Sequence, residues 1–240
     1  MTTIRIMSYN LQGCRDSSAL CHTIQYWQAD LITLQNVTSL SVCRRLATQF
    51  GYSLYTNNQE NQSGGLVLLS KRSIKISRTY DFEYGAGCMY SEHTNGECRF
   101  NVLNVAMKGA FFKRPEQIRK LLSLDLFQTH SLQFPSLILG DFFDSIWVSG
   151  HYQFQDKFTR LSPTFLRGTY PSYFPILSRD RVYATDHIKL LAIHIDRSGP
   201  ARKATIHLPI VLDVEILDNR VSLSVEDSLQ SRMEIATDPL

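Results

Sequence analysis

Short segments with strand character recur along the whole chain. Residues 4–9, which read IRIMSY, alternate apolar and polar side chains and include β-branched ones, a pattern typical of a strand with one buried face. Residues 136–139 are largely apolar, as in strands that are buried on both faces. The segment 74–80 follows the apolar run 66–70 closely and is expected to pair with it. Similar patterns predict further strands at 31–34, 99–107, 181–183, 189–195 and 208–216.

Helical spacing of apolar residues marks three segments between these strands. A helix is predicted over 17–28, with Asp16 or Ser17 as its N-terminal cap. Further helices are predicted over 40–50 and 114–130, where apolar residues fall on one face. Strands that outnumber the helices, with helices between some of them, indicate an α/β protein of two packed sheets covered by helices.

Length and composition indicate one globular domain. The 240 residues are 43% hydrophobic and 20% charged, and no repeat or low-complexity linker marks an internal boundary. We therefore expect a single domain over 1–240, with its core at about 4–216 and a closing strand or tail after 217. The net charge of +3 is too small to indicate a polyanionic partner by itself. The basic residues around Lys108 and Arg114 are interpreted as the solvated face of a helix.

Cysteine usage and the N-terminal segment bear on the compartment. The five cysteines have no close pair of the kind that forms a zinc knuckle or a redox motif, so reduced thiols are the simplest interpretation. The first residues, MTTIRIMSYN, lack the form of a secretory signal. No run approaches the roughly 18 apolar residues of a transmembrane segment. These observations predict a cytoplasmic protein.

Polar side chains stand at or beside the ends of several apolar strands. They are Asn10, Asp141, Asp180 and His207. A buried sheet that places polar groups at one rim provides a rigid platform for a functional site. Each residue taken singly is equally consistent with a turn or a strand cap, but four such positions in one chain favour a site.

The motifs around these positions resemble, in order, those of the endonuclease/exonuclease/phosphatase superfamily. They are SYN with a following Gly, LITLQN, GGLVLLSK, VLNVAM, LILGDFFD, RDRVY and TIHLPIVLDV. The resemblance extends from about residue 4 to residue 216. It implies a four-layered α/β/β/α sandwich with two mainly antiparallel or mixed sheets, the deoxyribonuclease-I-like fold. The family includes deoxyribonuclease-I-like nucleases, abasic-site endonucleases, sphingomyelinases and inositol polyphosphate phosphatases.

The resemblance also implies a chemistry, phosphoester hydrolysis with Mg²⁺ or Mn²⁺ as cofactor. The metal ion would bind phosphate and leaving-group oxygens, while a His–Asp pair handles phosphoryl charge and protons. Asn10, Asp141, Asp180 and His207 match family positions and are the candidate catalytic residues. Asp141 is also the candidate metal ligand.

Four other family positions are changed. The metal-ligating Glu falls on Asn36, the phosphate-contacting His on Ala106, the Asn of G-D-x-N on Phe143, and the acidic residue before the last His on Ile206. Two carboxylates are thereby lost from a cation site, and hard cations prefer carboxylate oxygens. The metal site is therefore expected to be weakened. His207 and Asp180 are also consistent with a buried pair that holds two loops together.

Neighbouring polar residues offer alternative ligands. Gln12 and Asp16 follow the first motif, and Asp144 lies one residue beyond the changed Asn position. The pair Asp186–His187 resembles S-D-H but precedes the wrong strand, so it is interpreted as a decoy. Solvated loop residues are the favoured interpretation of Asp144 and Asp186.

Two functions therefore stay open. In the first, the chain is a catalytically impaired family member, a pseudoenzyme with no required cofactor. It would bind a partner protein or a phosphate-bearing ligand such as a nucleic acid, a phospholipid or an inositol phosphate. In the second, it is an active metal-dependent phosphodiesterase or phosphatase, a nuclease-like phosphoric ester hydrolase with a site rebuilt from Asp141, Asp180 and His207.

A third interpretation rests on aromatic residues interleaved with arginines, which can stack on bases or form a protein interface. These residues are Tyr152, Phe154, Phe158, Phe165, Tyr170, Tyr173 and Phe174, with Arg160 and Arg167. A packed loop is the commoner meaning of such a stretch. Because family members share a core and differ in their loops, the fold alone does not decide the substrate.

Overall fold

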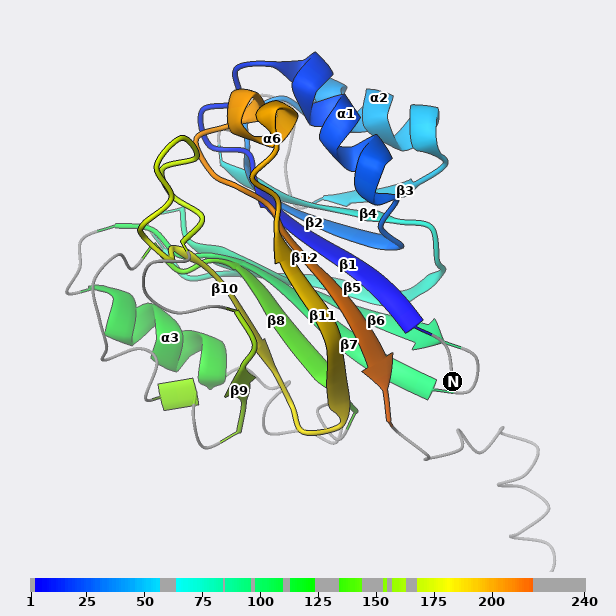
Figure 1. The fold of residues 1–240 in the computed structure, drawn as a ribbon. Coiled ribbons are helices and arrows are strands. Elements are labelled where there is room, and N and C mark those ends of the chain that lie inside the picture. The colour runs from blue at the N-terminus through cyan, green and yellow to red at the C-terminus, as the bar shows by residue number, and fades with distance from the viewer. Residues whose placement is uncertain are drawn as a thin grey trace, which may run out of the picture.

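The computed structural model describes residues 3–56, 64–83, 85–95, 98–109, 113–123, 134–143, 153–154, 157–162 and 168–217. Within these residues two six-stranded sheets face each other (Figure 1). The first has the order β11 (Ile188–Ile195), β12 (Ile210–Ile216), β1 (Thr3–Asn10), β2 (Leu31–Val37), β4 (Gly65–Ser70) and β3 (Ser53–Thr56). The second has the order β5 (Ile74–Asp81), β6 (Gly87–Asn95), β7 (Cys98–Ala106), β8 (Ser136–Asp141), β10 (Asp180–Ala184) and β9 (Thr159–Arg160).

Helices cover the outer faces of both sheets and complete four layers (Figure 1). The first sheet is covered by α1 (Ser17–Trp27), α2 (Leu40–Phe50) and α6 (Gly199–Ala204), and the second by α3 (Arg114–Leu122). The strands β1 and β2 are parallel, as are β7 and β8, whereas the other pairs are antiparallel. The predicted α/β/β/α sandwich with mixed sheets is therefore confirmed.

Strand periodicity assigns alternate side chains to two different cores. On β1, Ile4 and Ile6 face the core between the sheets, whereas Met7 and Tyr9 face the helices. The same alternation on β8 places Leu137 and Leu139 in the inter-sheet core. Because Asn10 follows Ile4 and Ile6 at even spacing, its side chain belongs to the inter-sheet side of β1.

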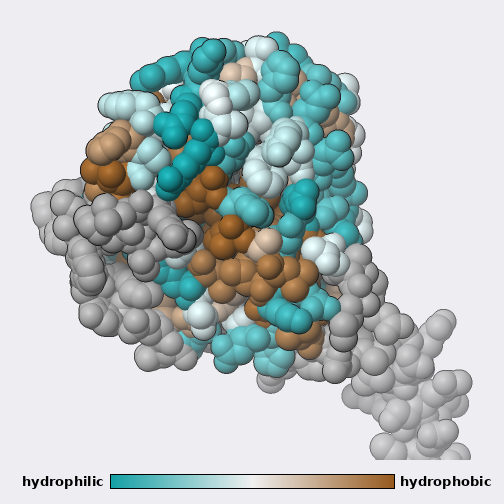
Figure 2. Space-filling model, in the orientation of Figure 1, coloured by the Kyte–Doolittle hydropathy of each residue, from teal (hydrophilic) through white to brown (hydrophobic). Residues whose placement is uncertain are grey.

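The inter-sheet core reaches the surface along the edge strand β11. Leu190, Ile193 and Ile195 are partly buried against that core, and Leu191 is exposed. Figure 2 shows an apolar patch over this strand. This side of the sandwich is therefore lined by apolar side chains, and the polar strand ends gather elsewhere.

The element predictions were mostly confirmed, with one pairing wrong. The strand at 74–80 does not pair with 66–70, because β5 pairs with β6 in the other sheet. The strands β3, β6 and β9 and the helix α6 were not predicted. Asp16 caps α1 as expected, since its carboxylate accepts the backbone N–H groups of Ser18 and Ala19. Of the helix predicted over 114–130, residues 124–130 lie outside the described residues.

No helix among the described residues combines the length and the apolar character needed to cross a membrane.

Candidate functional site

Three strands and one connecting segment bring polar side chains to one end of the sandwich. Asn10 ends β1, Asp141 ends β8 and Asp180 begins β10, each on the inter-sheet side of its strand. In the second sheet Asp141 pairs directly with Asp180. His207 lies in the segment between α6 and β12. The structure therefore brings together all four residues that were predicted to form the site.

These four side chains form one hydrogen-bonded network. The Asn10 amide nitrogen lies 2.8 Å from Asp141 Oδ2 and 3.3 Å from Asp180 Oδ1. His207 Nδ1 lies 2.7 Å from Asp180 Oδ2. All four residues are buried, with exposed fractions of 1% for Asn10 and Asp141, 2% for Asp180 and 0% for His207. The His207–Asp180 pair joins two segments, as one of the sequence-based interpretations anticipated.

Asn36 joins this network through an irregular backbone. Simple alternation along β2 would point residue 36 toward the helices, because Ile32 and Leu34 lie in that core. The pairing of β2 with β4 is irregular between Leu34 and Val37, and Asn36 has a left-handed φ of 54°. A bulge of this kind re-aims a side chain. The Asn36 amide nitrogen consequently donates to Asn10 Oδ1 at 3.0 Å and to Asp141 Oδ2 at 3.2 Å.

Arg179 is a site residue that sequence reasoning missed. It immediately precedes Asp180, and its Nη2 lies 3.4 Å from Asp141 Oδ2. Its guanidinium carbon lies 4.3 Å from the centre of the Phe143 ring and 4.7 Å from that of Tyr170. The available signal was its place in the RDRVY motif, but only the fold shows that its side chain turns toward Asp141.

A second set of groups holds His207 in place. Thr205 Oγ1 donates to the backbone oxygens of Asn10 and His207, at 3.1 Å and 2.8 Å, and accepts the His207 N–H. Thr169 Oγ1 donates to Asp180 Oδ2. The Tyr170 ring lies 4.8 Å from the His207 ring. The imidazole therefore has a defined position and a defined acid partner.

The protein shifts the pKa values of the two buried carboxyl groups in opposite directions. Burial and repulsion from Asp180 raise the pKa of Asp141, while Arg179 and His207 act against this shift. Burial opposes ionisation of Asp180 as well, but the charge and hydrogen bond of His207, aided by Thr169, lower the pKa of Asp180. Of the two groups, Asp180 therefore carries the more stable negative charge.

Three of the four changed family positions carry side chains without an oxygen atom that could ligate a metal ion. Ala106 is buried on β7 among apolar residues. Phe143 donates its backbone N–H to Asp141 Oδ1 at 2.7 Å, and its ring covers Arg179. The half-buried Ile206 side chain faces Gly13, where an added Cβ would lie 3.4 Å from it.

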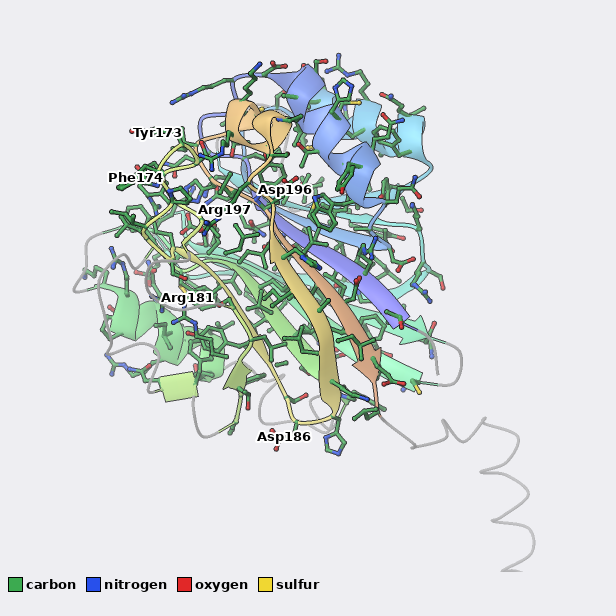
Figure 3. All side chains as sticks on the ribbon, viewed as in Figure 1. Tyr173, Phe174, Arg181, Asp186, Asp196 and Arg197 are labelled. Carbon is green, nitrogen blue, oxygen red and sulfur yellow. The ribbon has the colours of Figure 1, made fainter. Side chains whose placement is uncertain are left out.

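Among the described residues, the alternative ligands do not supply the missing charge. Gln12 Oε1 lies 3.4 Å from His207 Nε2, and the Asp16 carboxylate is occupied as the cap of α1. Asp186 is exposed at the far end of the sheets, as Figure 3 shows, which confirms that Asp186–His187 is a decoy. Asp144 lies outside the described residues.

These contacts test whether a divalent metal ion fits the site. Asp141 Oδ2 already receives donors from Asn10, Asn36 and Arg179, and Oδ1 receives the Phe143 N–H. A hard cation needs several oxygen lone pairs directed at one point. Across the described residues no group of three or more His, Cys, Asp or Glu side chains is placed to hold a metal ion. The donor set of the described residues does not fit Mg²⁺ or Mn²⁺.

Two further cationic side chains lie around the network. Lys108 is half-buried, and its Nζ lies 3.4 Å from the Gly64 carbonyl oxygen. Burial lowers the pKa of Lys108, whereas attraction to Asp141 acts in the opposite direction. The Arg114 guanidinium lies 4.9 Å from the centre of the Phe143 ring. For these two residues the prediction of a solvated helix face was wrong, because both are partly buried and Lys108 precedes the helix α3.

The aromatic segment divides between core and surface. Phe154 and Phe158 are buried, and Phe154 stacks on Tyr183. Tyr173 and Phe174 are 70% and 64% exposed. Figure 3 shows both at the end of the molecule away from Asp186. Tyr152, Phe165 and Arg167 lie outside the described residues.

Comparison with known proteins connects this architecture to one family. The family model described as "Endonuclease/Exonuclease/phosphatase family" matches residues 7–206. A search of curated proteins found no match.

Solved structures with low sequence identity share the fold. An endonuclease/exonuclease/phosphatase from Bacteroides vulgatus is 13% identical with a TM-score of 0.77, and the match covers 90% of this chain and 100% of that chain. The human nocturnin catalytic domain with bound sulfate anion is 15% identical with a TM-score of 0.74, covering 89% and 93%. TDP2 from D. rerio complexed with single strand DNA product is 12% identical with a TM-score of 0.73, covering 90% and 100%.

Proposed function

Because the chain belongs to the endonuclease/exonuclease/phosphatase family, we propose that it binds a phosphate-bearing ligand at the inherited site without hydrolysing it by a metal-dependent route. One observation carries the proposal. Every donor around Asp141, from Asn10, Asn36, Phe143 and Arg179, is already directed at its carboxylate oxygens. The Asp141 carboxylate therefore serves as a hydrogen-bond acceptor within the protein, and its oxygens have little capacity left to ligate a metal ion.

The charges around the network support an anionic ligand. Asp141 and Asp180 are buried and paired, with Arg179 and His207 as their partners. Lys108 and Arg114 add positive charge on the partly exposed side. An excess of cationic groups near the surface attracts phosphate, since phosphate recognition depends on such charge-assisted contacts. The sulfate in the nocturnin structure and the DNA product in the TDP2 structure agree with this ligand class for the fold.

The position of His207 supports loss of hydrolysis. The ring is fully buried, with Nδ1 on Asp180 and Nε2 facing Gln12. A general acid or base must reach the proton that it transfers, directly or through one water molecule. An imidazole enclosed in this way is placed to hold two segments together.

The proposal is tested by assaying hydrolysis and binding on the same sample. Nucleic acid, phospholipid and inositol phosphate substrates are each incubated with the protein and with Mg²⁺ or Mn²⁺. We expect no turnover above background, together with measurable binding of at least one substrate class. Robust turnover that disappears in Asp141→Ala would overturn the proposal, as would failure to bind all three classes.

A second candidate function is an active phosphoesterase built on Asp141, Asp180 and His207. The 2.7 Å contact between His207 and Asp180 favours it, because this His–Asp pair is what phosphoryl transfer would need. This alternative requires tight binding of Mg²⁺ or Mn²⁺. Calorimetry with either metal distinguishes the two functions, because only the active enzyme should give saturable binding.

The same proposal includes a cytoplasmic location. All five cysteines are free thiols in the structure, as expected in a reducing compartment. The candidate phosphate-bearing partners are a nucleic acid, a phospholipid and an inositol phosphate, and a partner protein is the alternative. The substrate screen separates these ligand classes.

A further inference from the structure

Arg179 holds a position from which a guanidinium can replace a bound cation. Its side chain is 8% exposed and pairs with the 2% exposed side chain of Asp141. The aromatic rings of Phe143 and Tyr170 lie over the guanidinium at 4.3 Å and 4.7 Å. These cation–π contacts hold the guanidinium in place without using its in-plane N–H groups as hydrogen-bond donors to a side-chain oxygen.

One of those in-plane groups has no acceptor among the described residues. Nη2 is directed at Asp141 Oδ2, but the buried Nε has no hydrogen-bond partner. A buried donor without an acceptor is costly, and native proteins rarely leave one unpaired. An N–H group of this kind in a cationic side chain indicates a site for an acidic oxygen.

The surrounding charges favour a phosphate oxygen as that acceptor. Asp141 is paired with Arg179, and Asp180 is paired with His207. Arg179 and the half-buried Lys108 supply two positive charges beside Asp141. With Nη2 directed at Asp141, the Nε–H group is the donor left for one phosphate oxygen, in a charge-assisted hydrogen bond.

We propose that Arg179 is an internal cation that takes the place of the divalent metal, with Nη2 on Asp141 and Nε donating to an oxygen of the bound phosphate. This inference rests on the proposed function and names the group that holds the ligand. The bridge between carboxylate and phosphate that a metal ion would make is made instead by a side chain. Phosphate binding at this site is therefore independent of divalent metals.

The test measures binding of inorganic phosphate by calorimetry in EDTA and again in excess Mg²⁺. The full chain should bind with the same affinity in both conditions. Arg179→Lys keeps the charge but loses the fork and the Nε donor, so its affinity should fall roughly tenfold or more, as for the loss of one charge-assisted hydrogen bond. Arg181→Met is the matched control, because Arg181 is equally buried and directs its Nε to the Ser178 carbonyl. Its affinity should not change.

A second variant distinguishes a loss of phosphate binding from a loss of folding. Arg179→Met alone leaves Asp141 buried without its cation, so it is combined with Asp141→Asn to remove both charges together. Circular dichroism should show a folded protein, and phosphate binding should be lost. In the ¹H–¹⁵N spectrum of the unaltered chain, the Arg179 Nε–H signal should shift as phosphate is added.

The outcomes separate this inference from the proposed function. Phosphate binding that requires Mg²⁺, or that persists in Arg179→Lys and in the double variant, overturns the role of Arg179 but leaves ligand binding intact. Absence of phosphate binding by the unaltered chain in EDTA also overturns it. Failure of every phosphate-bearing substrate in the screen overturns the proposed function itself.

Discussion

At the scale of single residues, the site depends on amide and guanidinium donors where a metal site would have oxygen ligands. Asn36 illustrates the change, because its left-handed backbone suits an Asn and its amide nitrogen donates to Asp141. Phe143 shares a left-handed φ, of 50°, which is unusual for a bulky residue. The cation–π contacts of its ring with Arg179 and Arg114 offset the strain of this backbone conformation.

Asn36→Asp tests the direction of the hydrogen bond to Asp141. The new carboxylate would face Asp141 Oδ2, which now accepts the Asn36 amide at 3.2 Å. Repulsion between two buried carboxylates raises the pKa of the introduced Asp in the folded protein. The loss of folding stability therefore develops as pH rises above the pKa of that Asp in the unfolded chain. We expect a loss of about 3 kcal/mol relative to the unaltered chain at pH ~7.5 and a much smaller one at pH ~4.5. Urea unfolding at both pH values measures it.

Asn36→Ala is the control for this variant, because it removes the same hydrogen bonds without adding a charge. Its deficit should be nearly the same at the two pH values. A pH-independent deficit for Asn36→Asp would contradict the assigned hydrogen bond.

The buried His93 should make folding stability depend on pH independently of the polar network. Burial, aided by repulsion from Arg72, lowers the pKa of His93 to about 3, and its ring stacks on Phe100. Between the unfolded value of about 6.5 and this folded value the unfolded chain binds the extra proton, so stability is lost as pH falls. Going from pH ~7.5 to ~5 should cost about 2 kcal/mol from this group alone.

His93→Phe should flatten that part of the profile, because the aromatic stacking on Phe100 is kept and the titrating group is removed. Ser91 Oγ keeps its hydrogen bond to the Val102 carbonyl in the variant. Chemical denaturation of both proteins at the two pH values provides the comparison. An unchanged pH slope in His93→Phe would show that other groups cause the acid sensitivity.

At the scale of elements, alternation along strands explains why the sequence predicted so much of the site. Asn10, Asp141 and Asp180 lie at ends of strands whose apolar pattern is clear, so their meeting follows from strand parity. The pairing of 74–80 was wrong because adjacency in sequence does not decide which sheet a strand joins. The missed strand β6 reads GCMYSEHTN and owes its place to its neighbours β5 and β7, since its own pattern is mixed.

Gly140 lies directly before Asp141, at a point where β7 and β8 approach each other closely. A Cβ at Gly140 would lie 1.9 Å from the Val105 carbonyl oxygen, and the residue has φ of 141°. Gly140→Ala should therefore cost more than about 3 kcal/mol or prevent folding. Gly51→Ala is the control, because Gly51 also has positive φ but no atom within 4 Å of the added Cβ, so about 1 kcal/mol is expected. Equal losses in urea unfolding would contradict the steric account.

At the scale of the whole molecule, two sheets that meet at one end enclose a polar network inherited from a phosphoesterase scaffold. The sequence predicted the four network residues that match family positions. It also predicted that the family's polar residues are replaced at Asn36, Ala106, Phe143 and Ile206. It did not predict Arg179 or Lys108, because their roles depend on which side chains approach Asp141 from distant segments. A motif comparison reveals which groups are missing, whereas only the fold reveals what replaced them.

The central claim is that this centre no longer takes a divalent metal ion. The most direct measurement is isothermal titration of the full chain with Mn²⁺ and Mg²⁺ to millimolar concentrations, with Asp141→Asn as the matched variant. The account predicts no saturable heat in either protein, because the Asp141 oxygens are occupied by Asn10, Asn36, Phe143 and Arg179. Saturable binding to one site in the unaltered chain, abolished in Asp141→Asn, would contradict it.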